Sequence, residues 1–222
     1  MNLIKTKVMT NNSTTTPILV NEMPLEYVKD YIYLGKQISF KNSRILKEID
    51  RRIALTWRKY WAHKEIFKSK LPIELKKTVL DSTILPCLTY GCQTWILDTR
   101  ARKKIQTTQR AMARSCLNIR LSDRVRNTAI RSKTKVTDAL VFSQNHKWRW
   151  AGHVARYCDD RRTLRKTKWK GPGGSRSRGR PCARWQDEIV ENAGHDWVAT
   201  ASDRETWNSL EEAFTRRGST LN

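Results

Sequence analysis

Short runs of β-branched and aromatic residues, separated by turn residues, occupy the first 40 positions of the chain. They cover residues 8–9, 18–20, 25–28 and 31–38, and Asn, Pro and Gly interrupt them. Runs of this length between turn residues are typical of strands in small hairpins. The pattern therefore predicts a start made of short β-hairpins.

The spacing of apolar residues takes a helical period after position 44. Every fourth residue is apolar, with Arg and Lys between, at Ile45, Ile49, Ile53, Trp57 and Trp61. This spacing predicts one long amphipathic helix that ends near Ser69 and turns this stripe toward a core.

Three more helices are predicted before residue 132. The first has Pro72 in its opening turn and ends at Pro86, because proline lacks an N–H and clashes with the preceding turn. The next covers residues 105–116 and stops near Asn118, and the last takes Asp123 as its N-cap. We expect this region to fold around a core made of Ile49, Ile53, Trp57, Val79, Ile84, Ile105 and Met112.

A fifth helix, with Thr137 as its N-cap, carries a single apolar stripe. The stripe consists of Leu140, Val141, Trp148, Ala151 and Ala155. Gly152 in the middle costs about 1 kcal/mol relative to Ala in a helix and indicates close packing.

The last fifth of the chain divides into two parts. Residues 170–181 hold no side chain that can fill a core, which predicts a flexible basic linker. A small helical unit follows, with apolar positions at Trp185, Ile189, Trp197, Trp207, Leu210 and Phe214. The predicted fold class is therefore mainly α, with short β-hairpins at the N-terminus, a helical bundle, a basic linker and a small C-terminal helical unit.

The charge of the chain is strongly positive and unevenly distributed. The 222 residues include 44 Lys and Arg against 21 Asp and Glu, a net charge of +23. Residues 1–144 carry +17, residues 145–184 carry +11, and residues 185–222 carry −5. An excess of this size predicts a polyanionic partner, and the mixture of cations with aromatic residues favours RNA or DNA over a lipid surface.

Targeting and redox signals suggest an intracellular protein, nuclear or cytoplasmic. No apolar run reaches the roughly 18 to 20 residues of a membrane helix, so no membrane partner is expected. Residues 1–10 lack the apolar segment and cleavage site of a signal peptide. The five cysteines form no Cys-x-x-Cys pair, which favours a reducing compartment.

Two motifs resemble catalytic or metal sites without the context that such sites need. Tyr157-Cys158-Asp159-Asp160 has the form of a polymerase metal-binding tetrapeptide, but a predicted helix precedes it and arginines follow it, where a polymerase has strands. His153 and Cys158 could join His146, Cys182 or His195 at zinc, but structural zinc sites usually combine two closely spaced pairs. We therefore expect no catalytic residues, metal ligands or cofactor.

Cations alternate with indole rings between residues 145 and 184. Cations neutralise phosphates and exposed rings stack on unpaired bases, so this segment is the candidate nucleic-acid-binding site, acting mainly through phosphates. Its residues are Lys147, Arg149, Trp150, Arg156, Arg161, Arg162, Arg165, Lys166, Lys168, Trp169, Lys170, Arg176, Arg178 and Arg180.

Six sequence blocks, in this order, resemble the C-terminal third of endonuclease-reverse transcriptases from non-LTR retrotransposons. The blocks are Lys5-Thr6-Lys7-Val8-Met9-Thr10-Asn11, Tyr33-Leu34-Gly35, Leu85-Pro86-x-x-Thr89-Tyr90-Gly91-x-x-Thr94-Trp95, Gln109-Arg110-x-Met112, Lys147-Trp148-x-Trp150-Ala151-Gly152-His153-Val154-x-Arg156 and Arg178-Gly179-Arg180-Pro181-x-x-Arg184-Trp185. The match continues through Asp203-Arg204-x-x-Trp207 and Glu212-Ala213-Phe214.

The resemblance implies a division of the chain and a limit on its chemistry. Residues 1–42 would be the end of the palm with a primer-grip-like hairpin at Tyr33, Leu34 and Gly35, and residues 43–132 a thumb-like helical domain. A basic Trp-rich helical region (133–169), a flexible basic linker (170–184) and an acidic helical unit (185–222) would follow. The family's catalytic carboxylates and their Mg²⁺ belong to the palm that precedes this region, so the chain by itself is expected to be inactive.

Two other interpretations remain open from the sequence. A domesticated or adventitious gene product could act as a protein-interaction module through exposed Trp faces, with its charge incidental. A zinc-dependent binding module is the weaker of the two. Nucleic-acid binding should weaken steeply with salt, whereas a Trp-faced protein interface should not.

Overall fold

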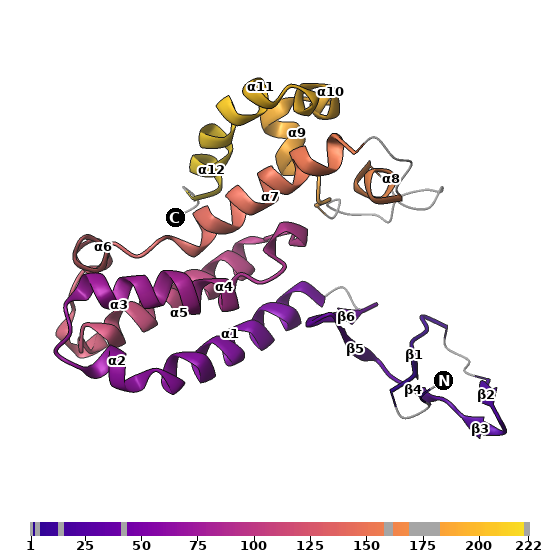
Figure 1. The fold of residues 1–222 in the computed structure, drawn as a ribbon, viewed down its shortest axis with the longest axis horizontal. Coiled ribbons are helices and arrows are strands. Elements are labelled where there is room, and N and C mark those ends of the chain that lie inside the picture. The colour runs from indigo at the N-terminus through magenta and orange to yellow at the C-terminus, as the bar shows by residue number, and fades with distance from the viewer. Residues whose placement is uncertain are drawn as a thin grey trace. The chain divides into compact units, whose positions relative to one another are not determined.

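The computed structural model describes residues 2, 5–12, 16–40, 44–157, 162–168 and 183–219, without the side chains of residues 44 and 217–219. The described part is mainly helical, with short strands confined to the first 40 residues (Figure 1). This confirms the predicted fold class. The chain divides into two compact units, residues 1–51 and 52–222. The predicted linker at 170–181 lies outside the described residues.

The described residues of the first unit form three two-stranded sheets. Strand β1 (Lys7–Val8) pairs in parallel with β4 (Glu26–Tyr27), and β2 (Leu19–Val20) pairs antiparallel with β3 (Met23–Pro24). The longest hairpin joins β5 (Asp30–Tyr33) to β6 (Lys36–Ser39) in antiparallel register. Its two-residue turn has φ +47° at Leu34 and +74° at Gly35. Positive φ at both central residues is the geometry whose twist suits a tight hairpin.

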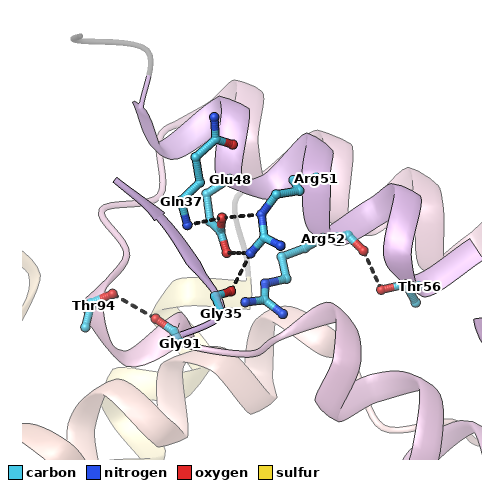
Figure 2. Close-up of polar contacts among 8 residues, drawn as sticks. All are labelled: Gly35, Gln37, Glu48, Arg51, Arg52, Thr56, Gly91 and Thr94. Carbon is cyan, nitrogen blue, oxygen red and sulfur yellow. Dashed lines mark hydrogen bonds and ion pairs between the residues drawn. The ribbon is translucent and has the colours of Figure 1, made fainter. Parts of the chain in front are cut away.

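The first turns of helix α1 (Arg44–Ala62) are bonded to this hairpin within the same unit. Buried Glu48 accepts the backbone N–H of Gln37 at 2.8 Å and a two-point ion pair from Arg51. Arg51 also donates to the carbonyl oxygen of Gly35 (Figure 2). The carboxylate thus satisfies a backbone donor of β6 and a cation of its own helix at once.

The buried face of α1 differs from the predicted stripe. Thr56 and Tyr60 are fully buried, while Trp57 is half-buried and Trp61 is 48% exposed. Residues four apart advance about 400° around a helix, so a four-residue repeat drifts about 40° per step. A stripe of five such residues winds about 160° around the helix and cannot face one core. The helix also ends at Ala62, and the separate helix α2 (Lys64–Lys68) replaces its predicted last turns.

The helix that follows runs through the proline at which it was expected to end. Helix α3 (Ile73–Val79) continues into a π-helical turn, η1 (Leu80–Ile84), and then into α4 (Leu85–Leu88). Pro86 lies in the first turn of α4, where a missing N–H is tolerated. The π turn resets the hydrogen-bond pattern just before the proline and lets the chain remain helical.

Helix α5 (Thr99–Cys116) completes the core of this bundle, and Asp98 caps its start. Tyr60 and Phe67 stack at 4.3 Å between ring centroids and pack with Leu80, Ile84, Met112 and Cys116. Burial raises the pKa of Tyr60 to about 12. Of the predicted core residues, Ile49, Ile84, Ile105 and Met112 are buried, whereas Ile53, Trp57 and Val79 are half-buried.

Two predicted helix caps are displaced along the chain. Asp123 ends a short 3-10 turn, η3 (Leu121–Asp123), and helix α6 (Asn127–Thr134) begins four residues later. Helix α7 (Ala139–Ala155) is capped by Asp138, whose carboxylate accepts the N–H groups of Leu140 and Val141. A carboxylate competes well with a threonine hydroxyl as a cap at the positive end of a helix.

Four short helices form the predicted C-terminal unit and pack with α7 around one apolar core. They are α9 (Asp187–Ala193), α10 (Trp197–Ser202), α11 (Arg204–Ser209) and α12 (Glu211–Ser219). In this core the rings of Trp148 on α7 and Trp207 on α11 stack at 3.9 Å, 7° from parallel. Each indole N–H donates to the other residue's backbone carbonyl, at 3.0 and 3.1 Å. No helix in the described ranges is long and apolar enough to cross a membrane.

Gly152 lies against this Trp pair, which confirms the close packing expected at that position. A Cβ atom there would lie 2.5 Å from Nε1 and 2.8 Å from Cδ1 of Trp207. Both distances are shorter than real Cβ contacts, and the hydrogen-bonded ring has little freedom to shift. The helix therefore lacks a side chain where the indole approaches its backbone.

We predict that Gly152→Ala lowers the free energy of unfolding by about 1 to 3 kcal/mol, because overpacking outweighs the helix propensity of Ala. Denaturant unfolding measures the change. In a Trp207→Phe background, which lacks the indole nitrogen, the same substitution should cost less. Equal costs in both backgrounds would contradict the contact with Trp207.

Candidate nucleic-acid interface

The first predicted cation, Lys147, is buried in an ion-paired triad. It is 3% exposed, and its Nζ lies 2.6 Å from Oε2 of Glu188 on α9. The other carboxylate oxygen of Glu188 accepts Nη2 of Arg102, on α5, at 2.7 Å. Burial lowers the pKa of Lys147, and Glu188 opposes that effect. One carboxylate therefore joins α5, α7 and α9, and Lys147 is directed inward.

Two further predicted cations of this segment also bond within the chain. Arg149 is 69% exposed, and its Nε donates to Glu211 at the start of α12 at 2.8 Å. Nη1 of Arg156 donates to the carbonyl oxygen of Ala201 on α10 at 2.6 Å, and burial lowers the pKa of Arg156. Both side chains hold the C-terminal helices against α7.

The predicted stacking residue Trp150 is half-buried against another indole. Its ring meets Trp185 edge to face, with centroids 5.1 Å apart. Trp185 donates its N–H to the carbonyl oxygen of Gln93 at 2.7 Å, and Lys147 lies 5.4 Å from the Trp185 ring centroid. Trp150 thus belongs to an aromatic cluster that is anchored on both sides.

The remaining predicted residues lie on helix α8 or beyond the description. Arg162, Arg165, Lys166 and Lys168 all lie on α8 (Arg162–Lys168) and are exposed. Arg161, Trp169, Lys170, Arg176, Arg178 and Arg180 fall outside the described residues. The structure therefore separates the predicted set into Lys147, Arg149 and Arg156, which bond to the C-terminal helices, and the exposed cations of α8, and the role of each in binding stays a prediction.

The residues predicted to be primer-grip-like form the tip of the β5–β6 hairpin in the first unit. Tyr33 is 57% exposed and Leu34 is 76% exposed. The carbonyl oxygen of Gly35 accepts the Arg51 guanidinium, which holds the turn on α1 (Figure 2). The tip therefore presents an aromatic and an aliphatic side chain on an anchored turn.

Exposed cations also lie outside the predicted binding segment. Four of them, here called the α6 patch, are Arg124, Arg126, Lys133 and Lys135. Another four, the α1–α2 patch, are Arg58, Lys59, Lys64 and Lys70. No side chain in either patch forms a hydrogen bond or ion pair with another described residue. Residues 120–135 hold six cations and one acid, so the chain has a second densely basic stretch before residue 145.

Most of the described Asp and Glu side chains accept hydrogen bonds or form ion pairs within the fold. Asp98, Asp138 and Asp203 cap helices, and hydrogen bonds from Thr206 and the Glu205 backbone lower the pKa of Asp203. Within the described ranges, no three His, Cys, Asp or Glu side chains gather closely enough to hold a metal ion. Asp159 and Asp160 lie outside those ranges. The described surface therefore offers excess positive charge rather than a metal-binding cluster.

Comparison with known proteins finds a relative that matches most of the chain. The chain is 30% identical to an uncharacterized transposon-derived protein of Caenorhabditis elegans over 225 residues, which cover 93% of this chain and 80% of that protein. No protein-family profile matches the chain, and no solved structure matches it.

We predict that Glu188→Gln lowers the free energy of unfolding by roughly 2 to 4 kcal/mol, since it removes the carboxylate charge that pairs with buried Lys147 and Arg102. Thermal or denaturant unfolding measures the loss. Glu212→Gln is the matched control, because the Glu212–Arg216 pair is about three-quarters exposed and should contribute under about 0.5 kcal/mol.

A second substitution tests the cause of that loss. Adding Lys147→Met to Glu188→Gln removes the uncompensated buried ammonium and should recover part of the stability. No recovery, together with an equal cost for Glu212→Gln, would show that the triad does not join these helices.

Proposed function

The chain belongs to a family of transposon-derived proteins, and from that premise we propose that it is a nucleic-acid-binding region of a retrotransposon reverse transcriptase. In this proposal it corresponds to the part of the polyprotein that follows the catalytic carboxylates of the palm. Its task is to hold RNA or DNA, mainly through phosphates, while other regions of the element's protein supply the polymerase and endonuclease chemistry.

The observation that carries the proposal is that acids and cations have different roles in the described residues. Acids cap helices or bind buried cations, as Glu188 does, whereas the α6 patch and the α1–α2 patch remain exposed. A surface with many unpaired cations and few free acids attracts a polyanion and releases its counterions on binding. The net charge of +23 gives this attraction its long range.

The more specific assignment to a reverse transcriptase rests on the ordered sequence blocks. The blocks within the described residues fall on the β1 segment, on the turn of the β5–β6 hairpin, on α4 and α5 of the helical bundle, and on α7. The residues shared with the family at 147–156 include Trp148 and Gly152, which here form the contact with Trp207. This packing gives a structural reason for Trp and Gly at these two positions of the block.

The alternative of a Trp-faced interaction module has less support. Trp95, Trp148, Trp197 and Trp207 are at most 2% exposed, and Trp57, Trp150 and Trp185 are half-buried. Most of the described indole surface is therefore already used inside the fold.

We predict a salt-dependent, sequence-tolerant affinity that falls when unpaired cations are removed. Replacing Arg176, Arg178 and Arg180 by Ala should weaken binding to unrelated sequences alike and reduce the slope of log affinity against log salt by up to about 2.7. Replacing three cations of the α6 patch, Arg124, Arg126 and Lys133, by Gln tests the described surface in the same way. Fluorescence anisotropy across a salt series measures both quantities.

A matched control changes the net charge equally at paired positions. Lys47, Lys77 and Arg216 each bond to an acid, so their triple replacement by Gln should alter the slope much less. If all three triple variants keep the wild-type affinity and slope, the charge is a solvated surface and the proposal is wrong.

A further inference from the structure

We propose that Trp61 is a stacking platform for one unpaired base of single-stranded nucleic acid, with the cations of the α1–α2 patch holding the adjoining phosphates. This inference rests on the proposed function and adds a second binding surface, on the helical bundle, to the predicted segment at 145–184. It assigns a base-contacting role to the last residue of the apolar stripe that the sequence predicts on this helix.

Trp61 differs from the other described tryptophans in its exposure. It is 48% exposed, whereas the remaining described indoles are half-buried or buried. Its position at the C-terminal end of α1 follows from the drift of the four-residue repeat, which carries it away from the core that receives Tyr60. An exposed indole has a large apolar area that a base can cover.

The ring of Trp61 is held in place by its neighbours. It stacks on Trp57 with ring centroids 6.0 Å apart and planes 20° from parallel. The ring of Tyr60 meets it edge to face at 5.4 Å. Tyr60 itself is fully buried, so the cluster is anchored in the bundle core. A ring that is already oriented loses little conformational entropy when a base stacks on it.

The charges around Trp61 select the occupant. Arg58 lies three residues before it, about one turn away on α1, and Lys64 begins α2 just after the end of α1, so exposed cations precede and follow Trp61 along the chain. Residues 58–70 contain five cations and one acid, Glu65. Of these cations, Lys68 is occupied, because it donates to the carbonyl oxygen of Ser115 and to Asn118. The exposed cations of the α1–α2 patch remain for a polyanion.

A single-stranded nucleic acid fits this arrangement better than a duplex or a lipid surface. An unpaired nucleotide has a free base face between two phosphates, which matches one ring between cations. Bases in a duplex are already stacked. Membrane insertion needs a continuous apolar face, whereas Arg58, Lys59 and Lys64 lie within three positions of Trp61 and are exposed. Duplex and membrane binding are therefore alternative outcomes of the test.

The experiment compares Trp61→Ala and Trp61→Leu with wild type on three probes of equal phosphate number. The probes are a labelled 12-nucleotide oligothymidylate, the same backbone without bases, and a hairpin duplex. Both variants should bind oligothymidylate about 5- to 150-fold more weakly, the range that corresponds to one lost base stack of roughly 1 to 3 kcal/mol. Binding to the abasic strand and the duplex should change less than about twofold.

Leu75→Ala is the control, because Leu75 is 53% exposed on α3 of the same unit. Trp61→Leu keeps apolar volume without an aromatic face, so it tests stacking even if Trp61→Ala lowers thermal stability. In wild type, photocrosslinking of an oligonucleotide that carries 5-iodouracil should attach to the peptide containing Trp61.

Each contrary outcome has a distinct meaning. Equal losses on abasic and base-containing strands, or unchanged binding to oligothymidylate, overturn the stacking site while the salt-dependent binding of the proposed function stands. If the Trp61 variants lose binding to vesicles with 30% phosphatidylserine while their oligonucleotide binding is unchanged, the ligand of Trp61 is a lipid surface and not a base. If wild type binds none of the oligonucleotides, both the proposed function and this inference fail.

Discussion

The stacked pair of Trp148 and Trp207 is the contact on which the C-terminal half of the structure depends. Two rings 3.9 Å apart exchange hydrogen bonds with each other's backbone, so each buried indole N–H is satisfied by the partner residue. A buried N–H without an acceptor would destabilise the core, and this pairing removes that cost for two residues at once. It requires the α7 backbone to approach the ring closely, which is why position 152 has no Cβ.

The electrostatic arrangement follows from the same contact. Once α9 to α12 pack on α7, their acids lie beside cations of the preceding helices, as Glu188 does with Lys147 and Arg102 and Glu211 does with Arg149. The acidic C-terminal segment therefore neutralises the cations of α5 and α7 against which it packs. In the described residues the cations of the α6 patch form no ion pair with these acids, so the C-terminal acids leave this positive charge exposed.

Sequence patterns predict those features that depend on neighbours along the chain. The hairpins, the helical bundle and the terminal helical unit all follow from periodicity and turn residues, and Gly152 stands out as an interruption in a helix. The patterns are wrong where register or tertiary contact decides. On α1 the four-residue repeat drifts around the helix, so its apolar stripe does not coincide with the buried face. The π-helical turn before Pro86 depends on how that segment packs.

The candidate site shows the same limit more clearly. Lys147 and Glu188 are 41 residues apart, so no local pattern reveals that this lysine is buried and ion-paired. Arg156 likewise bonds to a carbonyl on α10. Their sequence neighbours on α8 are exposed, although the composition of the two segments is alike. Charge density along the chain thus locates a basic region, whereas burial decides which of its cations can contact a ligand.

The aromatic residues divide between structure and surface for a geometric reason. Helices α9 to α12 are short, and a small core of short helices gains most stability per residue from large rings. The described indoles of that core are accordingly enclosed and contribute to folding. Helix α1 is long enough for its apolar repeat to wind out of the core, and the last ring of that repeat, Trp61, remains at the surface among cations. The drift that limits the packing of α1 is therefore also what supplies the bundle with an exposed aromatic residue.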